Sequence, residues 1–293
     1  MAFAAFVVTA LLAGGNAVGV RFSNRELAPL WGAGLRFSLA ALVLLGIMAL
    51  RRLPLPRGKA LAGALLYGLI NFGFTFALAY YALVRLHAGL GQTLLALVPL
   101  ATLLLAVAQR QERLRLASVV GTLLALAGVA VISGASFGKS LPFLSLLAAL
   151  GAVVCFAEAA VVVKGFPRVH PVTMNAVGMA TGAAFLLIAS LVAGQPWKVP
   201  ERTGTWVAVG FLVLVGSVVV FVLYLVVLKY WEASRVAYGF VITPIVTVLL
   251  SAWLDDEPIP IGLVFGGMLI LAGVYVGALR PARLRAMPPE PVP

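Results

Sequence analysis

The sequence has little charge, few acidic residues and no long polar segment between its apolar runs. Only 10% of its 293 residues are charged and nine are Asp or Glu, whereas 63% are hydrophobic. The mean hydropathy is +1.11. So few polar side chains could not cover the surface of a water-soluble fold. The composition therefore indicates an integral membrane protein, and the short connections exclude a separate soluble domain.

Cysteine and metal-ligand patterns are also scarce. The single cysteine, Cys155, lies in an apolar run and cannot close an intramolecular disulfide. His87 has no neighbours at metal-ligand spacing, so we expect no metal site and no cofactor. The net charge of +12 comes from Lys and Arg at the ends of apolar runs, where membrane topology accounts for them. We therefore do not expect nucleic acid as a partner.

Ten apolar runs are long enough to cross a bilayer as helices. About 20 residues span the hydrocarbon, and backbone polar groups must be satisfied within each segment. We therefore predict an all-α integral membrane fold with ten transmembrane helices. The predicted spans are 2–20, 28–50, 60–81, 88–108, 116–134, 141–163, 172–194, 205–228, 236–254 and 260–279.

The two ends of the sequence need separate interpretations. The first span contains small residues at Ala13-Gly14-Gly15 that resemble a signal-peptide cleavage site. It lacks a basic n-region, so we expect it to be retained as a helix. Residues 281–293 are basic and rich in proline, and we predict a disordered cytoplasmic tail there.

The middle of the chain returns after 145 residues without a gap. The identities in register are Pro99 and Pro244, Thr102 and Thr247, Glu112 and Glu257, Gly121 and Gly266, and Leu-Ala-Gly-Val at 126–129 and 271–274. Several identities in fixed register indicate an internal duplication. Each copy would hold five spans, which gives repeats at 1–137 and 138–280.

The basic residues predict that both termini are cytoplasmic. With the N-terminus inside, fourteen Lys and Arg lie in the inner connections and the tail, and Arg36 lies within a span. The outer connections hold six, namely Arg21, Arg25, Arg85, Lys139, Lys198 and Arg202. This asymmetry agrees with the positive-inside rule.

Because five is an odd number, the two repeats then have opposite orientations. The turn after span 4 is basic, with Arg110, Arg113 and Arg115. Its counterpart after span 9 is acidic, with Asp255 and Asp256. Inverted repeats are typical of secondary transporters, whose halves move about a site at the membrane midplane. We therefore predict a transporter of a small molecule, embedded in the lipid bilayer as a monomer or homodimer.

Pro99 and Pro244 fall near the middle of spans 4 and 9. A proline removes one helix hydrogen bond and frees the carbonyl four residues before it. A packing kink is one interpretation, but because both copies keep the proline we favour a hinge. Thr102 and Thr247 follow the prolines by three residues, and we expect them to bond back to carbonyls of their own helices.

Polar and aromatic residues lie on one face of each of two spans and near the starts of two other spans. They are Asn71 and Thr75 in span 3, Ser217, Phe221 and Tyr224 in span 8, and Gln92 and Tyr238 near the starts of spans 4 and 9. Polar groups in hydrocarbon usually face the bundle interior or a wet cavity. We predict that this set lines a substrate cavity suited to an organic solute. Hydrogen bonding between helices is the alternative for any one residue.

Three further residues place charge or an amide inside spans. Glu158 is the only carboxylate within a span, and it would carry a proton, contact a substrate ammonium or line the cytoplasmic vestibule. Asn16 occupies the matching part of span 1, and we assign it to the cavity as well. Arg36 is the only base within a span. It either closes a structural pair, which we favour, or touches a substrate carboxylate.

Small and aromatic residues predict packing and anchoring. Glycines form stripes in span 5, at Gly121 and Gly128, and in span 10, at Gly262, Gly266, Gly273 and Gly277. Small residues let helices approach closely in lipid, so spans 5 and 10 would hold the halves together or form a dimer contact. Aromatic residues at span ends are expected to be interfacial anchors, and they are Trp31, Tyr80, Tyr81, Tyr230 and Trp231.

With these residues in view, the chain resembles the drug/metabolite transporter superfamily, in particular its ten-span EamA type. The shared features are Pro-x-x-Thr, a downstream acidic turn and Gly-then-Ala-Gly in each half, together with Leu35-Arg36-Phe37. The resemblance covers essentially the whole chain. It implies an inner-membrane carrier with a cavity between spans 1, 3, 4, 6, 8 and 9. Within the superfamily the chain looks like the YddG type of amino-acid exporter, which implies efflux of aromatic or other neutral amino acids.

Together, the residues and the resemblance predict a non-enzymatic secondary transporter that exports amino acids by alternating access. A carrier of drugs or other metabolites and a passive channel are alternatives. A third is a membrane-embedded, metal-dependent enzyme such as a prenyltransferase, with Asp255-Asp256-Glu257 as a magnesium site. Such a site needs further oxygen ligands, and the sequence has no second acidic cluster.

Overall fold

The computed structural model describes residues 2–109, 116–135, 142–230, 239–256 and 259–276. Within these residues the regular structure is entirely helical, which confirms the all-α prediction. The first half holds α1 (Ala2–Asn24), α2 (Pro29–Leu50), α3 (Lys59–Gly68), α4 (Thr75–Ala82), α5 (Ala88–Leu95), α6 (Val98–Ala108) and α7 (Leu116–Ala135). The second holds α8 (Phe143–Lys164), α9 (Pro171–Val192), α10 (Thr203–Val213), α11 (Val220–Tyr230), α13 (Gly239–Leu254) and α14 (Ile261–Val274).

Many of these segments are long and apolar enough to cross a membrane. Six qualify by length and composition, namely Pro29–Leu50, Lys59–Ala82, Ala88–Leu105, Phe143–Val163, Pro171–Val192 and Thr203–Val227. Three shorter apolar helices are Val119–Val131, Thr243–Leu254 and Ile261–Val274. The protein is thus a multi-pass membrane protein, while the number ten and the sidedness stay predictions.

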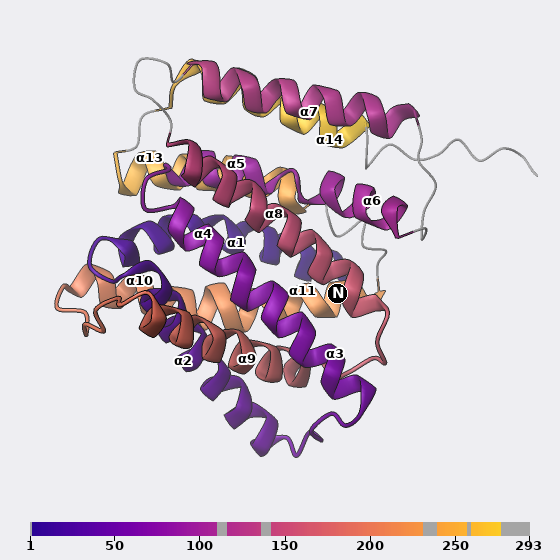
Figure 1. The fold of residues 1–293 in the computed structure, drawn as a ribbon, viewed down its shortest axis with the longest axis vertical. Helices are drawn as coiled ribbons and strands as arrows, with labels where there is room; N and C mark the ends of the chain where they lie inside the picture. Colours follow the sequence, from indigo (N-terminus) through magenta and orange to yellow (C-terminus); the bar gives the residue numbers. More distant parts are fainter. Residues whose placement is uncertain (1, 110–115, 136–141, 231–238, 257–258, 277–293) are drawn as a thin grey trace, which may run out of the picture.

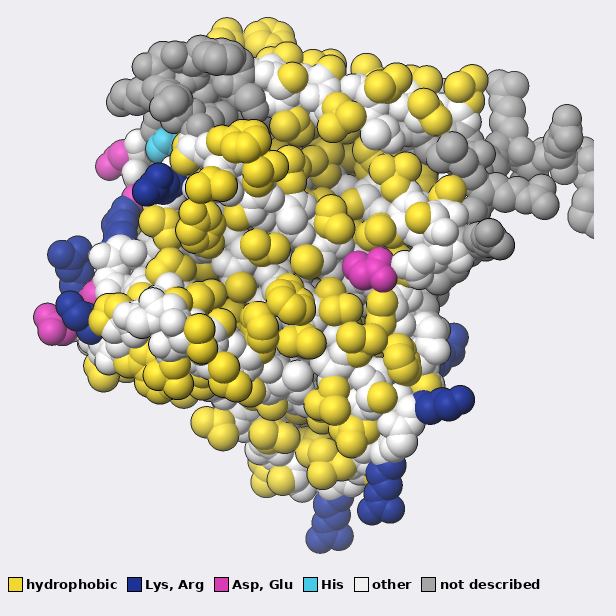
Figure 2. All heavy atoms as spheres, in the orientation of Figure 1, with side chains coloured by type: hydrophobic (Ala, Val, Ile, Leu, Met, Phe, Trp, Pro, Cys, Tyr) yellow, Lys and Arg dark blue, Asp and Glu magenta, His cyan; other side chains and the backbone are white. Residues whose placement is uncertain are grey.

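The surface has the polarity expected of a protein in lipid. Hydrophobic side chains cover most of the face shown in Figure 2, and Lys and Arg gather at its left edge and lower right. Leu42, Leu123 and Leu191 are examples of large apolar side chains that are more than half exposed. In water such exposure would be costly, whereas in a bilayer these side chains meet acyl chains.

Two π-helical segments lie at equivalent positions of the two copies. Segment η1 (Leu69–Phe74) joins α3 to α4, and segment η2 (Leu214–Val219) joins α10 to α11. Their first residues are 145 apart, as in the duplicated turns. In each region a hydroxyl bonds the carbonyl five residues earlier, Thr75 to Ile70 at 3.0 Å and Ser217 to Leu212 at 2.8 Å. Such single π turns occur frequently at functional sites.

Pro99 and Pro244, which occupy equivalent positions in the two copies, have different local structures. Helix α5 ends at Leu95, and Pro99 lies in the first turn of α6, where a missing N–H costs nothing. Pro244 instead lies inside the continuous helix α13. The two prolines that we predicted at mid-span therefore lie in different surroundings. The helix is interrupted just before Pro99, whereas α13 continues through Pro244. Their hinge role stays a prediction.

The threonines after the prolines behave as expected. Thr102 Oγ1 donates to the Val98 carbonyl at 2.8 Å, and Thr247 Oγ1 contacts the Thr243 carbonyl at 3.0 Å, which confirms the back-bonding. Thr247 Oγ1 also lies 2.6 Å from the Gly14 carbonyl on α1. The second copy therefore ties α13 to α1 beside its proline.

The helices pair in a pattern that repeats between the copies. Helix α2 packs along α9, and α7 packs along α14, so equivalent helices meet each other. Helix α1 packs on α13 and α11, and its counterpart α8 packs on α6 and α4 in the same way. Figure 1 shows α7 and α14 side by side as an outer layer, with α2 and α9 at the opposite side of the molecule.

Glycines allow the close contact between α7 and α14. A Cβ added to Gly128 would meet the carbonyl of Gly266, and a Cβ on Gly273 would meet the carbonyl of Gly121. Because residue numbers rise on one helix as they fall on the other, α7 and α14 run antiparallel. Gly262 is also buried on α14, and Gly277 lies outside the described residues.

Candidate substrate site

A buried arginine lies where the two copies meet. Arg36, on α2, is fully buried. Its Nε donates to Ser217 Oγ at 2.8 Å, and its Nη2 donates to Asn16 Oδ1 at 3.2 Å and to the Gly216 carbonyl at 3.1 Å. The guanidinium therefore joins α1 and α2 of the first copy to η2 of the second.

The partners of this cation are neutral. Among the described residues Arg36 makes no ion pair, and the acceptors named above are an amide, a hydroxyl and a backbone carbonyl. A buried charge without a counterion is costly, and in membrane segments such groups usually mark a substrate or ion pathway. The structural role that we favoured for Arg36 is present, but it is a polar network and not a pair with an acid.

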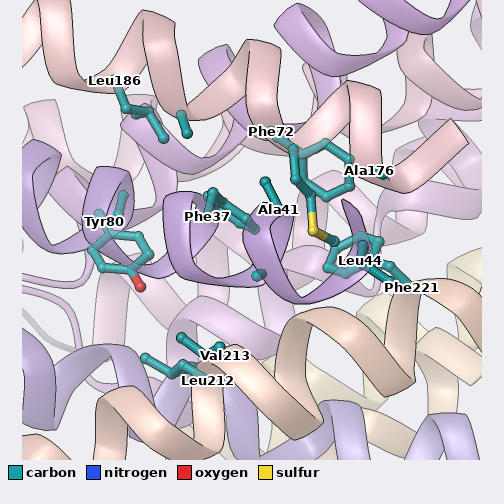
Figure 3. Close-up of a cluster of buried hydrophobic side chains, with 14 of the residues drawn as sticks. Phe37, Ala41, Leu44, Phe72, Tyr80, Ala176, Leu186, Leu212, Val213 and Phe221 are labelled. Carbon is teal, nitrogen blue, oxygen red and sulfur yellow. The ribbon is translucent and has the colours of Figure 1, made fainter. Parts of the chain in front are cut away.

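Aromatic rings surround the guanidinium on one side. The Arg36 Cζ atom lies 4.9 Å from the centroid of the Phe37 ring and 5.1 Å from that of Phe76, within cation–π range. Phe221 packs edge-on against Phe72 and Phe76, at centroid distances of 4.9 and 6.0 Å. Figure 3 shows Phe72 and Phe221 close together, with Phe37 beside them. We call Phe37, Phe72, Phe76 and Phe221 the aromatic cluster.

Three polar groups, from α3, η1 and α11, extend this centre. Asn71 Nδ2 donates to the Tyr67 hydroxyl at 3.2 Å, and both residues are buried. The Tyr67 and Tyr224 side chains are electrostatic neighbours. The Tyr224 ring packs against Phe156 of α8 at 6.0 Å. The aromatic cluster is therefore continued by polar atoms from η1 and from the second copy.

The predicted cavity residues fall into distinct groups. Asn16 and Ser217 contact Arg36 directly, and Phe221 belongs to the aromatic cluster. Thr75 is buried and bonds the Ile70 carbonyl of the adjoining η1, and Gln92 is buried on α5, which packs against α8 and α13. Tyr238 lies outside the described residues. These positions are compatible with the cavity prediction but do not test it.

Glu158 lies apart from the Arg36 network. Its two carboxylate oxygens accept from Gln109 Nε2 at 3.0 and 2.9 Å, at the C-terminal end of α6. The carboxylate therefore sits at the seam between α6 and α8, near the predicted cytoplasmic end. This position fits the vestibule alternative, and its role in transport stays a prediction.

Sequence reasoning missed the residues that complete the centre. Tyr80 was expected to be an interfacial anchor, which is wrong, because its side chain is fully buried next to Arg36. Tyr81, its neighbour, is 48% exposed. Tyr67 and Phe76 were not assigned, although Tyr67 precedes Asn71 by one turn and Phe76 follows Phe72 by one turn. This i, i+4 spacing was the available signal.

Ion pairs close the end of the bundle that we predict to be outside. Asp255, after α13, forms ion pairs with Arg21 and Arg25, and its contact with Arg21 Nε measures 3.3 Å. Arg21 Nη1 also donates to the Leu86 carbonyl at 2.7 Å. The end of α1 is thereby tied to the turns that follow α4 and α13.

A second tie at this end involves Glu26, in the turn between α1 and α2. Its carboxylate accepts from the backbone N–H groups of Glu201 and Arg202, before α10. The Thr205 hydroxyl and then the Glu201 N–H favour the charged form, so the pKa of Glu26 is lowered from its ordinary value. The α1–α2 turn of the first copy and the segment before α10 of the second copy are therefore joined by a carboxylate.

Comparison with known proteins identifies the family. Residues 1–134 and 143–278 both match the EamA-like transporter family. The chain belongs to this family. A solved crystal structure at 22% identity has the same fold, with a TM-score of 0.69 over 95% of this chain and 96% of the other.

Several transporters are similar along most of their length. An uncharacterized transporter of Bacillus subtilis (strain 168), YvbV, is 30% identical over 84% of this chain and 81% of its own. YedA, an uncharacterized inner membrane transporter of Escherichia coli (strain K12), is 27% identical over 95% and 93%. A probable terminal-alkyne amino-acid exporter of Streptantibioticus cattleyicolor is 29% identical over 82% and 79%. The narrower YddG-type assignment stays a prediction.

Proposed function

We propose that this EamA-like membrane transporter is a secondary carrier that exports amino acids, aromatic or otherwise neutral, by alternating access across the inner membrane. The observation that carries the proposal is the buried polar and aromatic centre around Arg36, formed where α1, α2, η1 and η2 meet. A carrier needs such a centre between its halves, shielded from both sides in at least one state.

The pairing of helices supports an inverted repeat with copies at 1–137 and 138–280. A two-fold axis in the membrane plane relates each helix to an antiparallel counterpart. The antiparallel contact of α7 with α14, through Gly128 and Gly273, is of this kind. The matched π-helical segments η1 and η2 fit the same symmetry. Two copies related in this way could open alternately to the two sides.

The chemistry of the centre supports an organic solute. Ring faces from the aromatic cluster suit an apolar or aromatic body, and Asn71 and Tyr224 suit a polar substituent. An inorganic ion would instead need a shell of oxygen ligands. One similar protein is named as a probable amino-acid exporter, and another as an inner membrane transporter, which supports the substrate class and the location.

The rival functions lack comparable support. For a metal-dependent enzyme, Asp255 would have to bind magnesium, but its carboxylate is engaged by Arg21 and Arg25. Among the described residues no three His, Cys, Asp or Glu side chains could hold a metal ion together. A passive channel would need a continuous pathway, whereas the centre is packed by buried side chains.

Efflux from proteoliposomes tests the proposal. Vesicles containing the full chain would be loaded with labelled phenylalanine, leucine, glucose or a cationic dye, with and without a pH gradient. We expect efflux of the amino acids that saturates with internal concentration and is faster than in protein-free vesicles. Saturable efflux of the dye or the sugar alone would reject the amino-acid assignment, and non-saturating efflux of all solutes would favour a channel.

A further inference from the structure

We infer that Arg36 and Tyr80 together form a binding site for the carboxylate group of a monocarboxylate substrate. This inference deepens the proposed transport function and rests on it. It assigns a partner to a charge that the fold leaves without a counterion, and it names the substrate group on which recognition depends.

The first argument is that two buried donors at this site have no acceptor. Arg36 Nη1 and the Tyr80 hydroxyl are both buried beside each other, and neither has a well-formed hydrogen bond to any other group in the described part of the chain. Even where Nη1 donates to the hydroxyl oxygen, the Tyr80 proton and a second Nη1 proton are left without an acceptor. A guanidinium nitrogen can only donate, and a tyrosine hydroxyl can donate one proton. One carboxylate oxygen could accept from both at once.

The second argument concerns charge. The other guanidinium nitrogens of Arg36 are satisfied by Asn16, Ser217 and the Gly216 carbonyl, so the fork is fixed in one orientation. An oriented guanidinium binds a carboxylate through short, charge-assisted hydrogen bonds. A bound carboxylate would also neutralise a cation that has only neutral partners. The free energy of that neutralisation would be available for binding the substrate.

The third argument is a line of unpartnered polar atoms that leads from Arg36 toward the outer end of α1. Of seven buried side-chain atoms without a partner in the described residues, four belong to Ser23, Asn24, Arg36 and Tyr80. Asn24 Nδ2 donates to the Tyr80 carbonyl at 3.0 Å. A Cβ added to Gly32, one turn before Arg36, would lie 3.1 Å from Ser23 Oγ and 3.7 Å from the Tyr80 ring.

These four residues therefore surround one location, formed by α1, α2 and α4. Buried polar atoms are normally satisfied by protein, water or ligand. A solute carboxylate between Arg36 and the end of α1 could accept from the Ser23 and Tyr80 hydroxyls, and the Asn24 carbonyl oxygen could accept from a donor on the same solute. The aromatic cluster also borders the guanidinium, where Phe37 and Phe76 contact it. The site thus fits an anionic head with an apolar or aromatic body.

Thermal unfolding of the purified full chain in detergent tests the inference without requiring transport. The probes are 3-phenylpropanoate and L-phenylalanine, each compared with its carboxamide, which has nearly the same shape but lacks the carboxylate charge. We expect both carboxylates to raise the unfolding temperature in a concentration-dependent way, with the amides at least tenfold weaker. Equal effects of acid and amide, or no effect of either carboxylate, would overturn the inference.

Variants separate binding from folding. Tyr80→Phe removes a hydroxyl that has no partner other than Arg36 in the described part of the chain, so we expect nearly normal unfolding without ligand and roughly tenfold weaker carboxylate binding. Arg36→Lys keeps the charge but loses the fork, and we expect a larger loss. Arg85→Gln removes an exposed charge from the turn after α4 and serves as the control. Wild-type affinity in a folded Tyr80→Phe and a folded Arg36→Lys would contradict the site.

The probes also distinguish this inference from the amino-acid proposal. If 3-phenylpropanoate binds through Arg36 but phenylalanine neither binds nor is exported, the carboxylate site stands and the amino-acid assignment fails. If phenylalanine is exported and its amide competes equally, the amino-acid assignment stands and the carboxylate site fails.

Discussion

The π-helical segments η1 and η2 occupy the same place in the two copies but differ in chemistry. In η1, Asn71 bonds Tyr67, and the segment contributes Phe72 to the aromatic cluster. In η2, the Gly216 carbonyl and the Ser217 hydroxyl accept from Arg36. The duplication has kept the π-helical backbone in both copies. In chemistry they differ, because η2 accepts hydrogen bonds from the charged Arg36, whereas η1 carries the bond between Asn71 and Tyr67. The symmetry therefore supports the movement that we propose, and the difference between the copies supports recognition of one end of a solute.

Pro99 and Pro244 also occupy the same place in the two copies but differ in local structure. Pro99 follows a break between α5 and α6, whereas Pro244 lies inside α13, which Thr247 ties to α1. Equivalent sequence has thus produced one interrupted helix and one continuous helix. The first copy therefore has the helix break, and the second copy has the contact from Thr247 to α1.

The largest effect should come from adding a methyl group to η2. In Gly216→Ala the new Cβ would overlap Asn16 Oδ1 and press on Arg36 Nη2. We expect a loss of about 2–4 kcal/mol in stability, because a buried polar network is broken. Thermal unfolding in detergent measures the change. Gly210→Ala, on α10 with no atom within 4 Å of the added Cβ, should leave the unfolding temperature unchanged or slightly higher, and equal losses in both would contradict the role of η2.

The seam between α7 and α14 should be the next most sensitive region. Gly128→Leu would force a side chain against the Gly266 carbonyl and Ile270, and overpacking of this kind costs about 1–3 kcal/mol. Gly46→Leu, on α2 with open space around it, is the matched control. A folded Gly128→Leu protein with normal unfolding but altered substrate preference would show that the seam has another role.

Replacing the prolines should affect transport rates moderately. Pro99→Ala would allow α5 and α6 to join into one helix, so we expect the initial rate of amino-acid efflux to fall about threefold or more. Pro244→Ala should have less effect, because α13 is already continuous. Unchanged rates in both variants would count against the hinge role.

The smallest effect should come from removing the carboxylate of Glu26, whose contribution to stability depends on pH. Because its folded pKa is lowered, the carboxylate stabilises the protein above the unfolded pKa, and this contribution is lost as pH falls through the folded value. Wild type should therefore unfold at a slightly higher temperature than Glu26→Gln at neutral pH. The difference should begin to shrink near the ordinary value of 4.5 and disappear below the lowered folded value. A difference that stays constant with pH would exclude the carboxylate as its cause.

Hydrophobic runs and the 145-residue repeat were sufficient to predict the helices and the equivalence of α7 and α14. The π turns were not predictable, because no residue type requires them and the surrounding packing selects them. Tyr80 was misassigned because position along a span indicates depth in the membrane but not the direction of the side chain. The contact of Arg36 with Asn16 and Ser217 depends on how α1, α2 and η2 pack, which local spacing does not determine.

The central claim is that the two copies cross the membrane in opposite directions around a shared centre. Arg57 and Arg202 are equivalent positions, 145 residues apart, and both are exposed in connections between helices. Single cysteines would be introduced by Arg57→Cys and by Arg202→Cys in a Cys155→Ser background and treated with a membrane-impermeant maleimide. We predict that residue 202 is labelled in intact cells and residue 57 only after permeabilisation. Labelling of both positions from the same side would contradict the inverted repeat.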